Sequence, residues 1–191
     1  MTKPLDMKDI AIIDAFPVYD CRKTVLNLGC GPGRIDFHLV KMGYRIWAID
    51  IKRYSEWKDS ENLTFHVADI FDLASMPIRE PDIIICSQVL EHLESYGIAL
   101  VNMMALARVR IIITIPYKHS FGSPGHRHFW DDKKNGEFKD VNEFKRICHP
   151  NGVAISKIRT KSKDAKTNKY NYLITVDKRQ NLMLKGKRWG T

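Results

Sequence analysis

The chain has 191 residues, of which 44% are hydrophobic and 28% are charged, so it can form one globular domain with a sizeable core. It contains no apolar run of about 20 residues and no basic, apolar leader, so we expect neither a membrane span nor a secretory signal. The four cysteines stand far apart without a Cys-x-x-Cys pair. This excludes a zinc ribbon, argues against a disulfide framework and favours a cytoplasmic location.

The net charge of +9 is concentrated at the C-terminal end of the chain. Residues 1–156 carry 20 basic and 20 acidic residues, whereas residues 157–191 carry 11 basic residues and two acidic ones. Such a region is either a solvated tail or a contact surface for phosphate-bearing partners such as nucleic acid. We therefore divide the chain into one domain over residues 1–177 and a basic tail over residues 178–191.

Short β-branched runs alternate with helical stretches over most of the chain. The segment 1–20 predicts a short helix from Met7 to Ala15. Strands are then expected at 24–28, 45–49, 63–67, 81–86 and 109–115, and helices at 34–42 and 89–107. Because these strands show little alternation of polar and apolar residues, they predict a parallel sheet covered by helices on both faces.

The pattern changes after Pro116. Residues 117–136 predict a loop rich in glycine, histidine, proline and aromatic residues. A short helix is expected at 141–148, followed by two strands at 153–160 and 170–177 that form a hairpin. This arrangement adds two antiparallel strands to five parallel ones.

The sequence VLNLGCGPG runs from the first predicted strand directly into Gly29, Gly31 and Gly33, and a helix follows. Glycines allow a tight turn and a close approach of the backbone to a ligand, and the helix start presents free N–H groups. Asp50 ends the next strand, where a carboxylate can meet ribose hydroxyls. The spacing differs from the Gly-x-Gly-x-x-Gly of dinucleotide-binding proteins, which disfavours a nicotinamide-dependent oxidoreductase.

Two further motifs complete a recognisable set. Ala68-Asp69-Ile70 follows the third predicted strand, and Ser87-Gln88-Val89-Leu90-Glu91-His92-Leu93 follows the fourth. With them, residues 24–117 resemble the class I S-adenosylmethionine-dependent methyltransferases. The resemblance implies a Rossmann-like three-layer α/β/α sandwich whose seven-stranded, mostly parallel sheet ends in an antiparallel hairpin. It also implies an enzyme that uses S-adenosylmethionine and releases S-adenosylhomocysteine.

The resemblance further implies which residues contact the cofactor. The implied contacts are Gly29, Cys30, Gly31 and Gly33 for the methionine part and the ribose, Asp50 for the ribose hydroxyls, Ile51, Asp69 and Ile70 for the adenine, and Cys86 and Ser87 for the sulfonium end. Asn27 is also expected at this site, although the family usually has Asp or Glu there to hold the cofactor's amino group. Asparagine keeps an acceptor oxygen but lacks the negative charge.

The histidine-rich loop after the fifth strand is long for a plain connection, so we interpret it as a wall of the acceptor site. The expected catalytic residues are Tyr117, His119 and His128, as candidate general bases. The expected acceptor contacts are Glu91, His92, His126 and Trp130. Although His126 and His128 form a His-x-His pair, no cysteine or carboxylate stands at convincing ligand spacing, so we expect no metal.

The sequence therefore predicts methyl transfer to an oxygen or nitrogen nucleophile of a small-molecule or sugar-like acceptor, because no added nucleic-acid-binding domain is recognisable. One alternative is a nucleic-acid methyltransferase that uses residues 157–191, where Tyr170, Tyr172 and Trp189 could stack on bases. Another is a non-catalytic protein that binds S-adenosylmethionine, for which Asn27 is the hint. The oligomeric state is not indicated.

Overall fold

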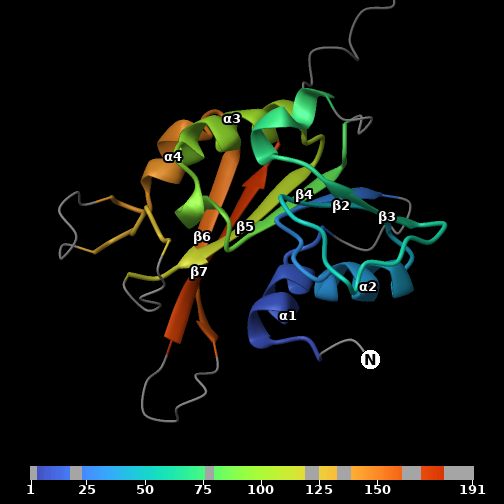
Figure 1. Cartoon of the computed structure of the whole chain (residues 1–191). Helices are drawn as coiled ribbons and strands as arrows, with labels where there is room; N and C mark the ends of the chain where they lie inside the picture. The colour runs from blue at the N-terminus through green and yellow to red at the C-terminus, as the bar shows by residue number, and fades with distance from the viewer. Residues whose placement is uncertain are drawn as a thin grey trace, which may run out of the picture.

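The computed structural model describes residues 4–17, 23–75, 80–118, 125–132, 139–160 and 169–178. In these ranges seven strands form a single sheet in the order β3-β2-β1-β4-β5-β7-β6 (Figure 1). The strands are β1 (Thr24–Leu28), β2 (Arg45–Asp50), β3 (Leu63–Val67), β4 (Ile83–Ser87), β5 (Arg110–Pro116), β6 (Gly152–Thr160) and β7 (Lys169–Asp177). The helices are α1 (Met7–Asp14), α2 (Arg34–Lys41), α3 (Tyr96–Leu106) and α4 (Glu143–Ile147), with 3-10 turns η1 (Ile70–Ser75) and η2 (Leu90–His92).

Strands β1 to β5 pair in parallel, whereas β7 runs antiparallel to both β5 and β6. This confirms the predicted mostly parallel sheet with an antiparallel C-terminal hairpin. The chain builds β1, β2 and β3 outward in one direction and then crosses back to place β4 beside β1. Open α/β sheets bind their ligands at such a reversal, outside the carboxyl ends of the strands.

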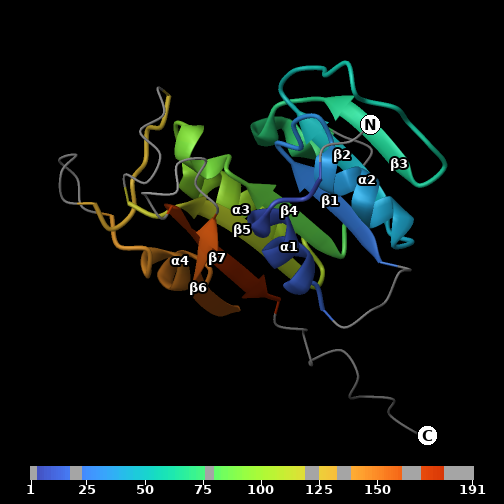
Figure 2. The same ribbon diagram turned by 90° about the horizontal axis from the view of Figure 1, so that it is seen from below.

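Helices cover both faces of the sheet, with α1 and α2 on one face and α3 and α4 on the other (Figures 1 and 2). Successive strand residues point to opposite faces, so β4 supplies both cores. Ile83 and Ile85 pack with residues of α1 and α2, whereas Ile84 and Cys86 pack with residues of α3 and α4. Burial on both faces explains why the sequence shows apolar runs here rather than an alternating pattern.

One prediction about the helices is wrong. The single helix expected at 89–107 is divided into η2 and α3, because Leu93 adopts an extended backbone conformation between them. No helix connects β2 and β3, since residues 51–62 form turns. None of the helices among the described residues has the length and apolar character needed to cross a membrane.

The basic C-terminal region is described only in part. Lys178 continues from β7, and its ammonium donates a hydrogen bond to the carbonyl of Met104 at the end of α3. The other residues of the predicted tail, 179–191, lie outside the described residues, as do residues 161–168 between β6 and β7. The division into a domain and a basic tail stays a prediction.

Candidate functional site

The turn after β1 is fixed by its three glycines. Gly29, Gly31 and Gly33 have φ angles of +69°, +56° and +81°, which side chains disfavour. The amides of Gly29 and Cys30 both donate to the carbonyl of Ile49, at 2.8 and 2.9 Å. These bonds fasten the turn to the carboxyl end of β2, the neighbouring strand.

Asp50 and Trp57 hold the middle of this turn. The Asp50 carboxylate accepts a hydrogen bond from the amide of Gly31 at 2.9 Å. The indole Nε1 of Trp57 donates to the carbonyl of Gly31 at 2.7 Å, and the indole stacks on Phe65 with ring centroids 4.9 Å apart. The Gly31 peptide groups are therefore held from both sides, which pre-organises the backbone for a ligand.

The three glycines have different surroundings. A Cβ atom added to Gly29 would lie 2.2 Å from Cγ2 of Val89, and one added to Gly33 would lie 2.7 Å from the ring of Phe65. A Cβ atom added to Gly31 would meet no atom within 4 Å. Open space beside Gly31, next to the Asp50 carboxylate, fits a ligand with hydroxyl groups that approaches the backbone closely.

An apolar rim continues from this turn along the carboxyl ends of β2 and β3. Ile51, Val67 and Phe71 expose 73%, 53% and 37% of their surface, although large apolar side chains are usually covered. Asp69, also exposed, accepts a hydrogen bond from the Phe71 amide at 3.0 Å. Apolar side chains between two carboxylates, those of Asp50 and Asp69, fit a flat nucleobase attached to a ribose. Ile70, predicted here for its backbone N–H, begins η1 with its side chain buried.

Asn27 has a partner that the sequence did not indicate. Its side-chain amide donates to both carboxylate oxygens of Asp36, at 2.9 and 3.0 Å, and both residues are buried. Burial raises the pKa of Asp36 to about 7, although the hydrogen bond from Asn27 favours the charged form. An acidic side chain in the first turn of α2 therefore lies directly beside Asn27.

Ser87 is the last residue of β4 and lies where the parallel strands have their carboxyl ends. Its hydroxyl lies 2.8 Å from the Thr114 hydroxyl of β5, and Gln88 follows with a left-handed backbone at φ +58°. The Gln88 amide donates to the Thr114 carbonyl at 2.9 Å, which holds this conformation. Cys86 does not line the site, because it is fully buried in the core under α3.

The segment 125–132 carries His126, predicted as an acceptor contact, and His128, predicted as a general base. His128 has both ring nitrogens engaged, since Nε2 lies 2.8 Å from the Leu93 carbonyl and Nδ1 lies 2.6 Å from Nζ of Lys139. Burial, reinforced by Lys139, lowers the pKa of His128. The ring therefore fastens its segment in neutral form and presents no free lone pair to a substrate. His119 lies outside the described residues.

Trp130 and Tyr117 occupy different depths of this region. Trp130 is fully buried, and its indole Nε1 donates to the Glu143 carboxylate at 2.7 Å, so it supports the wall instead of touching an acceptor. Tyr117 is partly exposed, with its ring 5.2 Å from that of Tyr172 and Nζ of Lys157 3.7 Å from its ring centroid. Of these two aromatic residues, only Tyr117 can face a ligand in this conformation.

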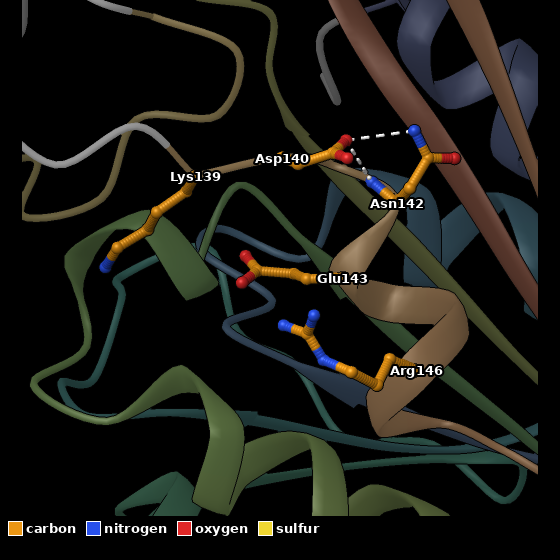
Figure 3. Close-up of a pocket in the computed structure, with 5 residues that line it drawn as sticks. All are labelled: Lys139, Asp140, Asn142, Glu143 and Arg146. Atoms are coloured by element: carbon orange, nitrogen blue, oxygen red, sulfur yellow. Dashed lines mark hydrogen bonds between the residues drawn. The ribbon is translucent and has the colours of Figure 1, made fainter.

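A hollow of about 350 Å³ lies beside α4, lined by Lys139, Asp140, Asn142, Glu143 and Arg146 (Figure 3). Asp140 accepts hydrogen bonds from the backbone and side chain of Asn142 there. Its lining is polar and charged, and it contains no residue of the glycine turn. This hollow is therefore distinct from the site formed by β1, β2 and β3.

Alanine substitutions at Gly29 and Gly31 separate backbone strain from steric clash. Gly31→Ala is expected to lower the free energy of unfolding by about 1–2 kcal/mol, the cost of a left-handed backbone for a residue with a side chain. Gly29→Ala adds the clash with Val89 and should cost about 2–5 kcal/mol in total. Urea unfolding of both variants measures the difference, and equal losses would contradict the packing of Gly29 on Val89.

The buried Asp36 makes stability depend on pH. Its pKa of about 7 in the folded chain lies above the usual 3.8, so the folded state holds this proton more tightly. Between about pH 4 and 7, the contribution of Asp36 to the free energy of unfolding therefore falls as pH rises. At about 1.4 kcal/mol per pH unit, Asp36→Asn should gain up to about 4 kcal/mol on the native chain across this range. Urea unfolding of both proteins at several pH values checks this, and a constant difference would refute it.

Comparisons with known proteins agree with this geometry. Residues 26–109 match the family model described as a methyltransferase domain. A Burkholderia thailandensis 1,6-didemethyltoxoflavin-N1-methyltransferase, solved with S-adenosylhomocysteine, is 18% identical with a TM-score of 0.62, covering 82% of this chain and 72% of its own. A Synechocystis magnesium protoporphyrin IX methyltransferase with bound S-adenosylmethionine is 19% identical with a TM-score of 0.59, covering 90% and 76%.

The same fold also occurs in a protein whose name gives a different activity, a [4+2]-cyclase. The cyclase SpnF is 14% identical with a TM-score of 0.64, covering 89% of this chain and 79% of its own. No curated protein matches the sequence. The predicted resemblance is nevertheless confirmed by the family model and the fold together: residues 26–109 match a methyltransferase domain, and the chain shares the fold of methyltransferases solved with S-adenosylmethionine or S-adenosylhomocysteine.

Proposed function

We propose that the protein transfers a methyl group from S-adenosylmethionine to an oxygen or nitrogen atom of a small-molecule acceptor. The observation that carries this proposal is the open, pre-organised turn at Gly31, with the Asp50 carboxylate beside it. The family match supports the reaction type. The acceptor class is supported by the two methyltransferases above, whose descriptions name 1,6-didemethyltoxoflavin and magnesium protoporphyrin IX.

The site residues at the ends of β1, β2 and β3 fit successive parts of the cofactor. Asp50 would hold the ribose hydroxyls, since its carboxylate lies beside the open space at Gly31 and accepts hydrogen bonds from the amides of Gly31 and Lys52, at 2.9 and 3.4 Å, which leaves acceptor capacity for a ligand. Ile51 would cover one face of the adenine, with Asp69 at the edge of the ring. Asn27 and Asp36 together would place a polar, acidic pair beneath the methionine end.

The chemistry needs positioning more than proton transfer. When bound, S-adenosylmethionine would supply a methyl group already activated by its sulfonium. The acceptor's lone pair would form the new bond to carbon, the sulfur would keep the electrons of the broken bond, and the acceptor's proton would leave to a base or to solvent. The protein has to hold the acceptor in line with that bond and exclude water. The carboxyl ends of β4 and β5, with Ser87 and Tyr117, lie where such an acceptor would be held. His119 stays a candidate base.

The alternatives are weakened by specific contacts. Asn27 hints at a non-catalytic protein, but an acidic residue is still present at this position of the fold, since the Asn27 amide is bonded to the Asp36 carboxyl group. For nucleic acid, Lys157 lies over the rings of Tyr117 and Tyr170, at 3.7 and 4.3 Å, so a base could stack on those faces only by displacing it.

Asp50→Ala is expected to weaken binding of S-adenosylhomocysteine at least about tenfold, because two hydrogen bonds to a charged group are lost. Calorimetric titration of the native and variant chains measures the dissociation constants. Asp14→Asn is the control, since Asp14 is an exposed carboxylate at the end of α1 and should leave binding unchanged. Equal affinities of the native and Asp50→Ala chains would refute the proposed pose.

The acceptor class is tested by product formation. With labelled S-adenosylmethionine, the protein should form S-adenosylhomocysteine when given the protein-free, nuclease-treated metabolite fraction of a cell extract. Purified RNA or DNA should give no product above the level without acceptor. Turnover with nucleic acid alone would favour that alternative, and binding of the cofactor without turnover in either mixture would favour a non-catalytic protein.

A further inference from the structure

Three side chains with metal-binding atoms meet around η2. Glu91 and His92 end this short turn, and His126 reaches them from the segment 125–132. One ligand atom from each residue lies within 4.8 Å of the other two. The imidazole centroids of His92 and His126 are 4.7 Å apart in an edge-to-face arrangement. A carboxylate and two imidazoles at this spacing can converge on one ion.

Glu91 is the unusual member of the group. It has no exposed surface, and neither carboxylate oxygen has a hydrogen-bond partner among the described residues. Buried carboxylates are costly unless they are paired, hydrogen-bonded or bound to a metal. An ion between Glu91 and the two imidazoles would supply the missing partner.

His92 is prepared as a ligand by its backbone contact. Its Nδ1 lies 3.1 Å from the carbonyl oxygen of Gly125. Because a carbonyl oxygen can only accept, Nδ1 carries the hydrogen and Nε2 keeps its lone pair. Histidines that bind metals usually have their other nitrogen bonded to a carbonyl or carboxylate in this way.

The segment that carries His126 is fastened to the same turn. The amides of Arg127 and His128 both donate to the carbonyl oxygen of Glu91, at 2.6 and 3.2 Å. The Arg127 guanidinium pairs with Glu94 at 3.0 Å, on the solvent side. The two segments that carry the three ligands are therefore held together by backbone hydrogen bonds and an ion pair. Metal sites need their ligands held in place in this way.

We propose that Glu91, His92 and His126 form a binding site for a divalent transition-metal ion of the zinc type. One carboxylate and two imidazoles suit Zn²⁺ and similar ions, and three protein ligands leave a coordination position open. His92 is exposed, so an ion can enter from solvent past it. This differs from our expectation of no metal, because His126 stands 34 residues after His92 in the sequence.

Glu91 follows Ser87 by four residues in the sequence. The proposed metal site therefore lies at the carboxyl ends of the strands, where the acceptor is proposed to bind. An ion there could bind an acceptor oxygen and lower its pKa, so that the oxygen attacks as an anion after its proton leaves to solvent. This catalytic role rests on the proposed function. The metal site itself does not, and the two are tested separately.

Titration of tag-free protein with Zn²⁺, after treatment with a chelator, tests the site directly. The native chain should bind one equivalent with a dissociation constant in the micromolar range or below. His92→Gln and His126→Gln should each weaken binding at least about tenfold, since losing even a group that only supports a metal ligand costs about 10–100-fold in affinity. Co²⁺ in place of Zn²⁺ should give visible absorption in the native chain that both variants lose.

The matched control is His38→Gln, which changes a partly exposed histidine of α2 and should bind Zn²⁺ like the native chain. Thermal unfolding and S-adenosylhomocysteine binding of each variant show that it is folded, and His92 is exposed enough to be replaced without loss of the core. Native-like Zn²⁺ binding by both ligand variants, or no site tighter than millimolar, would overturn the proposal. Neither result would depend on whether methyl transfer is observed.

Discussion

The structure depends most on how the turn Gly29–Gly33 is attached to β2. Its first amides bond to the carbonyl of Ile49, and its middle is held by Asp50 and Trp57. Because β1 and β2 are parallel neighbours, their carboxyl ends lie side by side at this turn. The hydrophobic cores on the two faces of the sheet hold both strands in place. The backbone is thereby held open before any ligand arrives, which reduces the ordering cost of binding.

Much of the fold follows from apolar runs and turn residues. Each predicted strand agrees with an observed one to within two residues, because strands buried on both faces leave a clear signal. The prediction of one helix at 89–107 was wrong because the apolar residues of this range belong to two elements, η2 and α3. Leu93 has an extended backbone between them. Periodicity records which residues are buried, and it does not record where the backbone breaks.

The site could be predicted only where its chemistry lies in consecutive residues. The glycine turn and Asp50 follow strands directly, so their roles could be inferred from order alone. Trp57 and Asp36 act through contacts made by folding back onto the turn, and no local pattern marks them. The proximity of Glu91 and His126 could not be predicted either, because it depends on a long-range contact. The amides of Arg127 and His128 bond to the Glu91 carbonyl and bring the segment 125–132 to η2.

The most direct test of the account is where the cofactor product binds. Backbone amide NMR spectra of the protein, recorded with and without S-adenosylhomocysteine, report on every described strand at once. The account predicts that the largest shifts occur at Gly29–Gly33, at Asp50 and Ile51, and at Asp69 and Ile70, with little change in β6. Shifts confined to the hollow beside α4, with the glycine turn unchanged, would contradict it.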